Sequence, residues 1–351
     1  MLPSESCPML KPCQGQSCII VWLKIAGFYE VVQLPSEHAD RSKQVLASRM
    51  SAQQVLPFTK MQALGNDFVV VSEDNLKKAF PVSEQDWEGE SSRAARLLCD
   101  RHFGVGADGL IVARSASGHS GQIGWHYVNS DGSGARICGN GLRCLALWAV
   151  ERRLVEPPDF TIKTAIGAVP VHFASADEIT IDLGEPILAS SEIPMSGTVR
   201  NHVVKESLTA GPSIVEITCV SMGNPHCVIF NPAFAEENLA ELAKTIQRLP
   251  AFPQGVNVEF AYTESRQRVR VLVWERGCGA TLACASGAAA VLVAGVLQDL
   301  LDRSATVVIP GGSLIVDWSV RDNHVRLTGP ARESFAGEVD LACLSAEVQL
   351  T

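Results

Sequence analysis

The stretch NSDGSGARICGNGLRC, residues 129–144, places a cysteine directly before Gly-Asn-Gly. The apolar run that follows, residues 142–150, predicts a helix that begins at this turn. A helix start offers free N–H groups and a partial positive charge, which suits an anion. We therefore expect the pKa of Cys138 to be lowered and its thiolate to be reactive. The alternative is a buried structural cysteine in a tight loop.

The same arrangement occurs a second time, in ERGCGATLACASGAAAVLVAG, which begins at Glu275. Cys284 lies nine residues after Glu275, just as Cys138 lies nine residues after Asn129. Paired signals precede both cysteines: LGND and GVGADG before the first, MGNPH and GVNVEF before the second. Three paired signals in one order indicate an internal duplication. The chain is therefore predicted to hold two similar halves related by a pseudo-twofold axis.

Such a duplication has a chemical consequence. Two cysteines at equivalent helix starts would face each other across the interface between the halves, where small-molecule sites often form. Two thiols that flank one carbon can remove a proton from one face and deliver a proton to the other. Their ordinary pKa of about 8.5 suits this work, and the pair would titrate as a unit. The pattern predicts a racemase or epimerase that needs neither cofactor nor metal.

Composition excludes several other classes. The 351 residues are 46% hydrophobic and carry a net charge of −9, which favours a globular chain and argues against a nucleic-acid surface. The eleven cysteines form no Cys-x-x-Cys pair or zinc-type cluster, which fits a reducing compartment. Two apolar stretches are poor membrane spans: residues 18–32 are too few and carry charges, and residues 280–298, rich in Ala and Gly, suit a buried core helix.

The first 55 residues differ from the rest. They hold several prolines and then a polar stretch, residues 37–54, and resemble neither a signal peptide nor an Arg- and Ser-rich transit peptide. Met50 would serve as a start. We expect residues 1–55 to be a poorly ordered extension, residues 56–182 with about 332–345 to form an N-terminal domain, and residues 183–331 to form a C-terminal domain.

From Pro57 onward, short β-branched runs alternate with few helical patterns. The expected strands are 68–71, 123–128, 160–162, 168–172, 179–182, 214–220, 228–230, 256–261, 269–275, 306–309, 313–318 and 324–327. The expected helices are 93–101, 141–152, 239–247 and 286–301. Many strands with few helices predict an α+β fold with mostly antiparallel pairing, because a Rossmann sheet needs a helix after nearly every strand.

Five segments in order resemble the diaminopimelate epimerase family: KMQALGNDF, DRHFGVGADG, NSDGSGARICGNGLRC, SMGNPHCVIF with GVNVEF, and WERGCGATLACASGA. The resemblance extends from about Pro57 to Val339. It implies a cofactor-independent enzyme of lysine and peptidoglycan-precursor synthesis, which interconverts LL- and meso-diaminopimelate. It also implies two similar domains, each a strand-rich barrel or sheet around a central helix, with a C-terminal segment that returns to complete the first domain.

The resemblance also implies the site residues. The catalytic set is Cys138 and Cys284 as acid and base, with Glu275 near the reacting amino group, and with His226 and Glu275 placed to tune the thiols. The substrate carboxylate is expected at the backbone N–H groups of Gly139, Asn140, Ala285 and Ser286. The rest of the substrate is expected at Asn66, Asn129, Asn224, Asn257, Glu275 and Arg276. Taken singly, these residues have structural alternatives, because asparagine commonly occupies turns, the histidine could be a satisfied core residue and the arginine a plain ion-pair partner.

The sequence departs from the family pattern in three places. Ala285 stands where members usually have glycine, Ala280 where they often have glutamate, and Gly109 where some place a substrate-binding glutamine. These changes leave room for a related substrate, so a proline, hydroxyproline or histidine racemase is the alternative. The proline branch usually has Cys-Gly-His-Gly where this chain has Cys138-Gly-Asn-Gly, and the phenazine-type isomerases lack the cysteine pair. A binding module or a thiol redox protein is a further possibility. For the family protein we expect a small amino-acid substrate, a homodimer and a cytoplasmic location, or a plastid one if the extension is a transit peptide.

Overall fold

The computed structural model describes residues 19–25, 28–34, 55–80, 86–115, 121–134, 137–232, 235–341 and 344. By compactness the chain divides into residues 1–54 and residues 55–351. In the first unit the structure describes an antiparallel hairpin of β1 (Ile19–Ile25) and β2 (Phe28–Leu34). The rest of the predicted extension lies outside the described residues.

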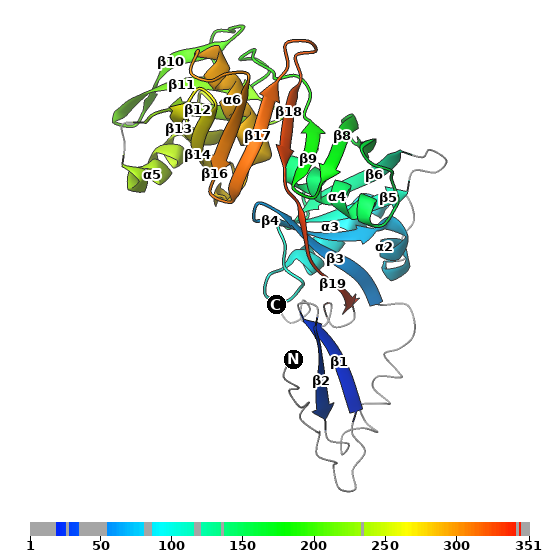
Figure 1. The fold of residues 1–351 in the computed structure, drawn as a ribbon. Coiled ribbons are helices and arrows are strands. Elements are labelled where there is room, and N and C mark those ends of the chain that lie inside the picture. The colour runs from blue at the N-terminus through cyan, green and yellow to red at the C-terminus, as the bar shows by residue number, and fades with distance from the viewer. Residues whose placement is uncertain are drawn as a thin grey trace, which may run out of the picture. The chain divides into compact units, whose positions relative to one another are not determined.

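The N-terminal half of the second unit is one mixed sheet (Figure 1). Its strands are β3 (Val55–Ala63), β4 (Asn66–Ser72), β5 (Gly109–Ser115), β6 (Gln122–Asn129), β7 (Asp159–Thr164), β8 (Gly167–Ser175), β9 (Glu178–Asp182) and β19 (Arg332–Asp340). They pair in the order β19-β3-β4-β5-β6-β7-β8-β9. Only the pairs β4–β5 and β6–β7 in this order are parallel.

The C-terminal half repeats this topology and adds one two-residue strand that pairs with β14. Its strands are β10 (Val203–Ala210), β11 (Ser213–Ser221), β12 (Pro225–Phe230), β13 (Asn257–Ser265), β14 (Arg268–Glu275), β15 (Gly279–Ala280), β16 (Ser304–Ile309), β17 (Gly312–Trp318) and β18 (Val325–Gly329). The pairing order is β10-β11-β12-β13-β14-β16-β17-β18, with β12–β13 and β14–β16 parallel. Strand β19 therefore takes, in the first half, the place that β10 takes in the second.

Each half wraps its sheet around one helix. In α4 (Gly139–Glu151) and α6 (Ala285–Leu297) nearly every residue is buried, from the first turn to the last. Helix α4 contacts strands from both ends of its pairing order, β3 and β19 at one end and β8 and β9 at the other. Helix α6 likewise contacts β11, β12, β16, β17 and β18. A helix that is apolar all round is thus surrounded by a curled sheet, which explains the uncharged run that the sequence showed.

Three other helices cover the outer faces. Helix α2 (Glu73–Ala79) packs on β3, β4 and β5, α3 (Trp87–Cys99) packs on β4, β5 and β6, and α5 (Glu236–Gln247) packs on β10 and β13. The residues that they bury form separate apolar clusters outside the sheets. No helix in the described part of the chain is long and apolar enough to cross a membrane.

The two halves meet through a strand pair and close backbone contacts. Strand β18 pairs with β9, which is its counterpart in the first half. On the turn between β16 and β17, Gly311 lies against Leu64 of the first half, so closely that a Cβ would come within 1.9 Å of the Leu64 carbonyl oxygen. Only glycine fits this contact. A cavity of about 210 Å³ adjoins it, lined by Gly311, Leu64, Gly65 and residues 330–332.

The α+β fold and its mostly antiparallel sheets are confirmed. All twelve predicted strands and all four predicted helices are present, with shifted ends. Among the described residues, seven strands and one helix were not predicted: β1, β2, β3, β5, β10, β15, β19 and α2. The division of residues 56–351 into two domains stays a prediction, although the repeated pairing order and the return of β19 to β3 follow it.

The boundary at Gln54 predicts how much of the N-terminus the second unit needs. A chain that begins at Met50 keeps all of β3 and should retain the melting temperature of the full chain. A chain that begins at Asn66 lacks β3, the strand that joins β19 to β4, and should unfold well below it. Thermal unfolding followed by circular dichroism measures both. A large loss of stability in the chain from Met50 would contradict the boundary.

Candidate active site

The two cysteines cap the two central helices in the same way. Cys138 has extended backbone angles (φ −144°, ψ 105°), and its sulfur accepts a hydrogen bond from Gly141 N at 3.5 Å. Cys284 has φ −125° and ψ 106°, and its sulfur accepts from Gly287 N at 3.4 Å. Each thiol thus takes the N-cap place that a serine or aspartate usually occupies. This equivalence confirms that the two cysteine motifs begin equivalent helices.

The two helix starts are in contact. A Cβ built on Gly139 would lie 2.8 Å from the Cβ of Ala285, so the first residues of α4 and α6 touch. The buried side chain of Asn140 crosses between the halves, because its Nδ2 donates to Ala283 O at 3.1 Å. The structure therefore brings together the four residues whose N–H groups were predicted to bind a carboxylate: Gly139, Asn140, Ala285 and Ser286.

The protonation of the thiols differs from the prediction. Burial raises the pKa of Cys138 to about 11, which outweighs the hydrogen bonds from Gly141 and Asn140 that lower it. Burial raises the pKa of Cys284 well above its usual value too, and the negative charges of Glu275 and Glu259 add to this. The prediction that the pKa of Cys138 is lowered is therefore wrong in its net direction, because burial opposes the helix start and is the larger effect.

A carboxylate lies beside the second thiol. Glu275, at the end of β14, accepts a hydrogen bond from Thr281 Oγ1 at 2.6 Å. Its pKa is raised by burial, against the opposing effects of Thr281, His226 and Cys284. Ser286 Oγ lies 3.5 Å from Cys284 Sγ. The family departure at Ala280 thus leaves Thr281 in place to hold this carboxylate.

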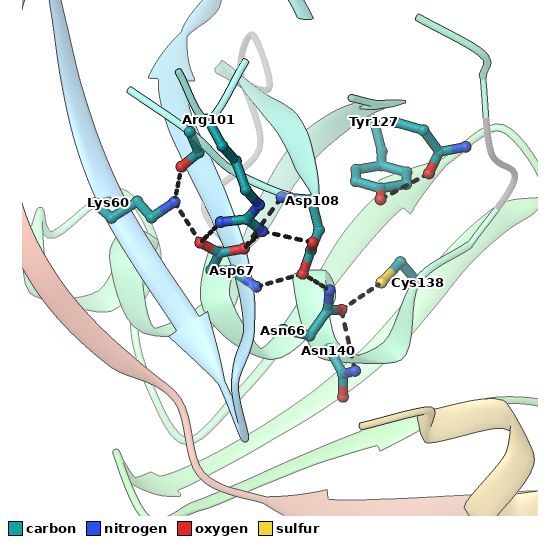
Figure 2. A network of polar contacts seen from close by, with 10 residues as sticks. Lys60, Asn66, Asp67, Arg101, Asp108, Tyr127, Cys138 and Asn140 are labelled. Carbon is teal, nitrogen blue, oxygen red and sulfur yellow. Dashed lines mark hydrogen bonds and ion pairs between the residues drawn. The ribbon is translucent and has the colours of Figure 1, made fainter. Parts of the chain in front are cut away.

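A chain of polar contacts leads to the first thiol (Figure 2). Asn66 Nδ2 donates to Asp108 Oδ2 at 2.6 Å, so its amide oxygen points the other way. This oxygen lies 3.8 Å from Cys138 Sγ and accepts from Asn140 Nδ2 at 3.2 Å. Behind it, Asp67 pairs with Lys60 at 2.6 Å and with Arg101 at 2.7 Å.

Four residues of this series of polar contacts were not predicted from the sequence: Lys60, Asp67, Arg101 and Asp108. Arg101 also bonds Asp108 at 2.7 Å, and its guanidinium is among the contacts that hold the pKa of Asp67 down to about 2 although burial raises it. All four lie inside the quoted segments KMQALGNDF and DRHFGVGADG. Each of the four residues is charged and lies in a segment that holds or adjoins a predicted site residue. This was the signal in the sequence that could have identified them.

A buried cation lies behind the start of α4. Arg143 is fully buried and donates to Pro330 O at 3.2 Å, to Gly139 O at 3.2 Å and to Asn140 Oδ1 at 2.9 Å. Burial lowers its pKa to about 10, so it remains charged at neutral pH. No carboxylate of the described residues pairs with it. This positive charge adds to that of the helix start.

Other predicted binding residues are engaged within the protein. Asn129 accepts from Tyr127 Oη at 2.9 Å and donates to Ser133 Oγ at 2.9 Å. Asn257 is buried and donates to Pro225 O at 3.2 Å, while its oxygen accepts from Arg276 N at 2.8 Å. The exposed Arg276 guanidinium bonds Gln254 O at 2.6 Å. These contacts position the segments around the cysteines, and the substrate-binding roles stay predictions.

His226 contacts neither thiol through a hydrogen bond within the described residues. Its ring nitrogens face Glu259 at 2.7 Å and Asn224 at 3.0 Å. Its predicted role in tuning the thiols therefore stays a prediction. No group of three His, Cys, Asp or Glu side chains in the described ranges is placed to hold a metal ion.

The comparisons with known proteins agree with this geometry. The family model for diaminopimelate epimerase matches residues 58–189 and 218–333. The chain belongs to this family. A diaminopimelate epimerase of Picosynechococcus sp. is 42% identical over 294 residues, which cover 82% of this chain and 100% of that protein. One from Heliobacterium modesticaldum is 39% identical over 291 residues, covering 82% and 100%.

Solved structures share the family's fold at low sequence identity. A hydroxyproline epimerase from Agrobacterium vitis matches with a TM-score of 0.58 and 14% identity, covering 82% of this chain and 93% of that one. A phenazine biosynthesis protein of the PhzF family from Bacillus anthracis matches with a TM-score of 0.56 and 14% identity, covering 82% and 99%. These likenesses show a common fold alone.

Gly109, one departure from the family pattern, has a structural explanation. A Cβ at this position would lie 2.7 Å from the hydroxyl oxygen of Tyr127 and even closer to its ring. The Tyr127 ring therefore fills the space that a side chain at position 109 would need. Its hydroxyl donates a hydrogen bond to Asn129. The same tyrosine therefore lies against Gly109 and contacts a residue that was predicted to bind the substrate.

The raised pKa of Cys138 predicts how its alkylation depends on pH. Below a pKa of about 11, the thiolate fraction and the rate should rise about tenfold per pH unit. For the empty enzyme and iodoacetamide, the rate at Cys138 should keep rising past the ordinary thiol pKa of about 8.5. Peptide mass spectrometry measures this rate, with glutathione in the same solution as the reference. An alkylation rate that levels off near pH 8.5 would show that the helix start affects the pKa of Cys138 as strongly as burial does.

The orientation of Asn66 predicts two effects of Asp108→Asn that have opposite signs. Loss of the carboxylate lets Asn66 turn its NH2 toward Cys138, and a donor favours the thiolate. Alkylation of Cys138 at pH 8 should therefore become faster, while turnover falls by about 10- to 100-fold because the amide is misplaced. Asp177→Asn, which breaks only an exposed pair with Arg332, is the matched control. Slower alkylation in Asp108→Asn would contradict the orientation.

Proposed function

We propose that this protein is a cofactor-independent epimerase that interconverts LL- and meso-diaminopimelate in lysine and peptidoglycan-precursor synthesis. The observation that carries the proposal is the pair of thiols, Cys138 and Cys284, at equivalent N-caps of two central helices whose first residues touch. Relatives named diaminopimelate epimerase match the sequence of this chain over 98% or more of their own length, which supports the same substrate for this chain.

The geometry suits a two-base reaction. The substrate carboxylate binds at the two helix starts, where N–H groups and Arg143 stabilise the negative charge that develops as the Cα–H bond breaks. One sulfur, as thiolate, takes this proton, and the thiol on the opposite face gives its proton to Cα. The product has the inverted configuration, and the two sulfurs have exchanged their protonation states. Glu275 receives the ammonium group beside the reacting carbon, while the asparagines and Arg276 hold the distal end.

The runner-up substrates are proline, hydroxyproline and histidine. The structural likeness to a hydroxyproline epimerase carries no argument for substrate at 14% identity. The predicted distal groups, among them Asn224, Asn257 and Arg276, favour a longer substrate with a second amino-acid end. The homodimer, and the cytoplasmic or plastid location, stay predictions.

Deuterium exchange tests the function directly. Protein incubated with LL-diaminopimelate in deuterated water should incorporate deuterium at Cα and produce the meso isomer, without added pyridoxal phosphate or metal. Cys138→Ala and Cys284→Ala should each lower the rate at least 100-fold, the loss expected for a general acid or base. Cys219→Ala, which removes a buried thiol from the outer cluster under α5, is the control and should remain active.

Two outcomes would overturn this proposal. Exchange with proline or hydroxyproline but not with diaminopimelate would move the protein to another racemase class. More than a few per cent of wild-type activity in either cysteine variant would contradict the two-thiol mechanism.

A further inference from the structure

The duplicated halves differ at one buried pair. In the strand register, Phe68 of β4 faces Gly109 of β5, and at the equivalent places His226 of β12 faces Asn257 of β13. Two residues further along, Ile111 of the first half corresponds to Glu259 of the second. The helices confirm this equivalence: a Cβ on Gly141 would meet Ile111, and a Cβ on Gly287 would meet Glu259. An apolar Phe–Ile pair is thus replaced by a His–Glu pair.

This His–Glu pair is sealed from solvent. Both side chains are 0% exposed, and His226 Nδ1 lies 2.7 Å from Glu259 Oε1. His226 Nε2 lies 3.0 Å from Asn224 Oδ1. The second oxygen of Glu259 is buried and has no hydrogen-bond partner among the described residues. A buried carboxylate with one hydrogen bond requires an opposite charge beside it.

The ring of His226 faces two acceptors. A carboxylate accepts hydrogen bonds only, and the amide oxygen of Asn224 does the same. A neutral imidazole has one N–H and can satisfy one of them, whereas the doubly protonated ring satisfies both. The contacts therefore correspond to an imidazolium between Glu259 and Asn224, and this cation is the charge that the buried carboxylate requires.

We propose that Glu259 is a positioning residue: it keeps His226 doubly protonated, and the Nε2–H of His226 in turn fixes the amide of Asn224 with its Nδ2 toward the substrate. Nδ2 of Asn224 makes no hydrogen bond within the described part of the chain. As part of the proposed function, it is therefore the donor for an acceptor atom of the substrate, such as a carboxylate oxygen.

The equivalent asparagine of the first half is held the other way round. Asn66 gives its NH2 to Asp108, so it presents its oxygen toward Cys138 and Asn140. Asn224 gives its oxygen to His226 and presents its NH2. In the first half, the carboxylate of Asp108 bonds the asparagine directly. In the second half, the carboxylate of Glu259 acts through the imidazolium of His226. The two equivalent amides therefore have opposite orientations. A symmetric duplication thereby acquires the polarity needed to bind an amino acid in one direction.

Other titratable groups also face this pair. Glu275 of β14 interacts electrostatically with both His226 and Glu259. The charge of Glu259 raises the pKa of Cys284 at the start of α6 and of Cys227 on β12. Neither cysteine supplies a cation that could replace His226 as the partner of Glu259.

Nitrogen-15 NMR of the imidazole rings tests the proposal without using activity. The chain has eight histidines, and His226→Gln identifies the resonances of His226 by their loss. In the wild-type protein at neutral pH, both ring nitrogens of His226 should show the shifts of protonated nitrogens. In Glu259→Gln at least one should show the shift of an unprotonated nitrogen. A neutral His226 ring in the wild type overturns the proposal whether or not the variant folds, and so does an unchanged ring in the variant.

The kinetic readout separates positioning from a structural role. Glu259→Gln keeps the shape and removes the charge, so the loss of a correctly oriented Asn224 should raise KM for diaminopimelate about tenfold, as for one lost hydrogen bond to a charged group. The kcat should change less, since no thiol has been altered. Glu259→Asp retains the charge and should recover part of the affinity. A fall in kcat with KM unchanged overturns the proposal. If diaminopimelate is not a substrate at all, the NMR result still decides the positioning role.

Discussion

The contact between the starts of α4 and α6 is the constraint on which the site depends. Two helix N-termini carry partial charges of the same sign, and bringing them together costs electrostatic energy unless an anion lies between them. Here Gly139 and Ala285 touch, and the buried cation Arg143 lies behind the first of them. The fold holds this arrangement through β18–β9 pairing, the Asn140 bridge and the tight Gly311 contact. In the proposed function a bound carboxylate relieves this repulsion, so its binding should stabilise the contact between the two halves.

Local sequence patterns predict most strands and helices of the two halves, but not the elements that lack such a pattern. Strands with β-branched runs and inward-facing helices follow from local pattern, because burial on one face imposes alternation. Strand β19 reads RESFAGEVD and is largely exposed, so it has no such pattern, and only its distant pairing with β3 makes it a strand. Helix α2 has seven residues, too few for helical periodicity to be visible. The resemblance to a family supplied the return of the C-terminus, which periodicity could not.

The candidate site shows the same division between local and three-dimensional information. Motif spacing was enough to place both cysteines at helix starts, because a glycine turn before an apolar run is a local signal. The partner of Asp108 was not visible in the sequence, since it lies 42 residues away at Asn66. The pKa of Cys138 was predicted in the wrong direction for a related reason. The helix start is a local feature, whereas the burial that dominates depends on how the whole half packs around the sulfur.

Asymmetry between the halves bears on how a two-thiol reaction runs in both directions. Because the proposed reaction exchanges the protonation states of the two sulfurs, the thiols work best when their pKa values are close in the complex. The two sulfurs have unequal surroundings: Glu275 raises the pKa of both, whereas Glu259 raises that of Cys284 and Arg143 lowers that of Cys138. In the proposed reaction the substrate ammonium lies beside Glu275 and cancels part of this negative charge, and the imidazolium of His226 balances Glu259. Binding then lowers the pKa of both thiols, because Glu275 acts on both of them, so the substrate itself brings the pair toward the range in which one sulfur is a thiolate.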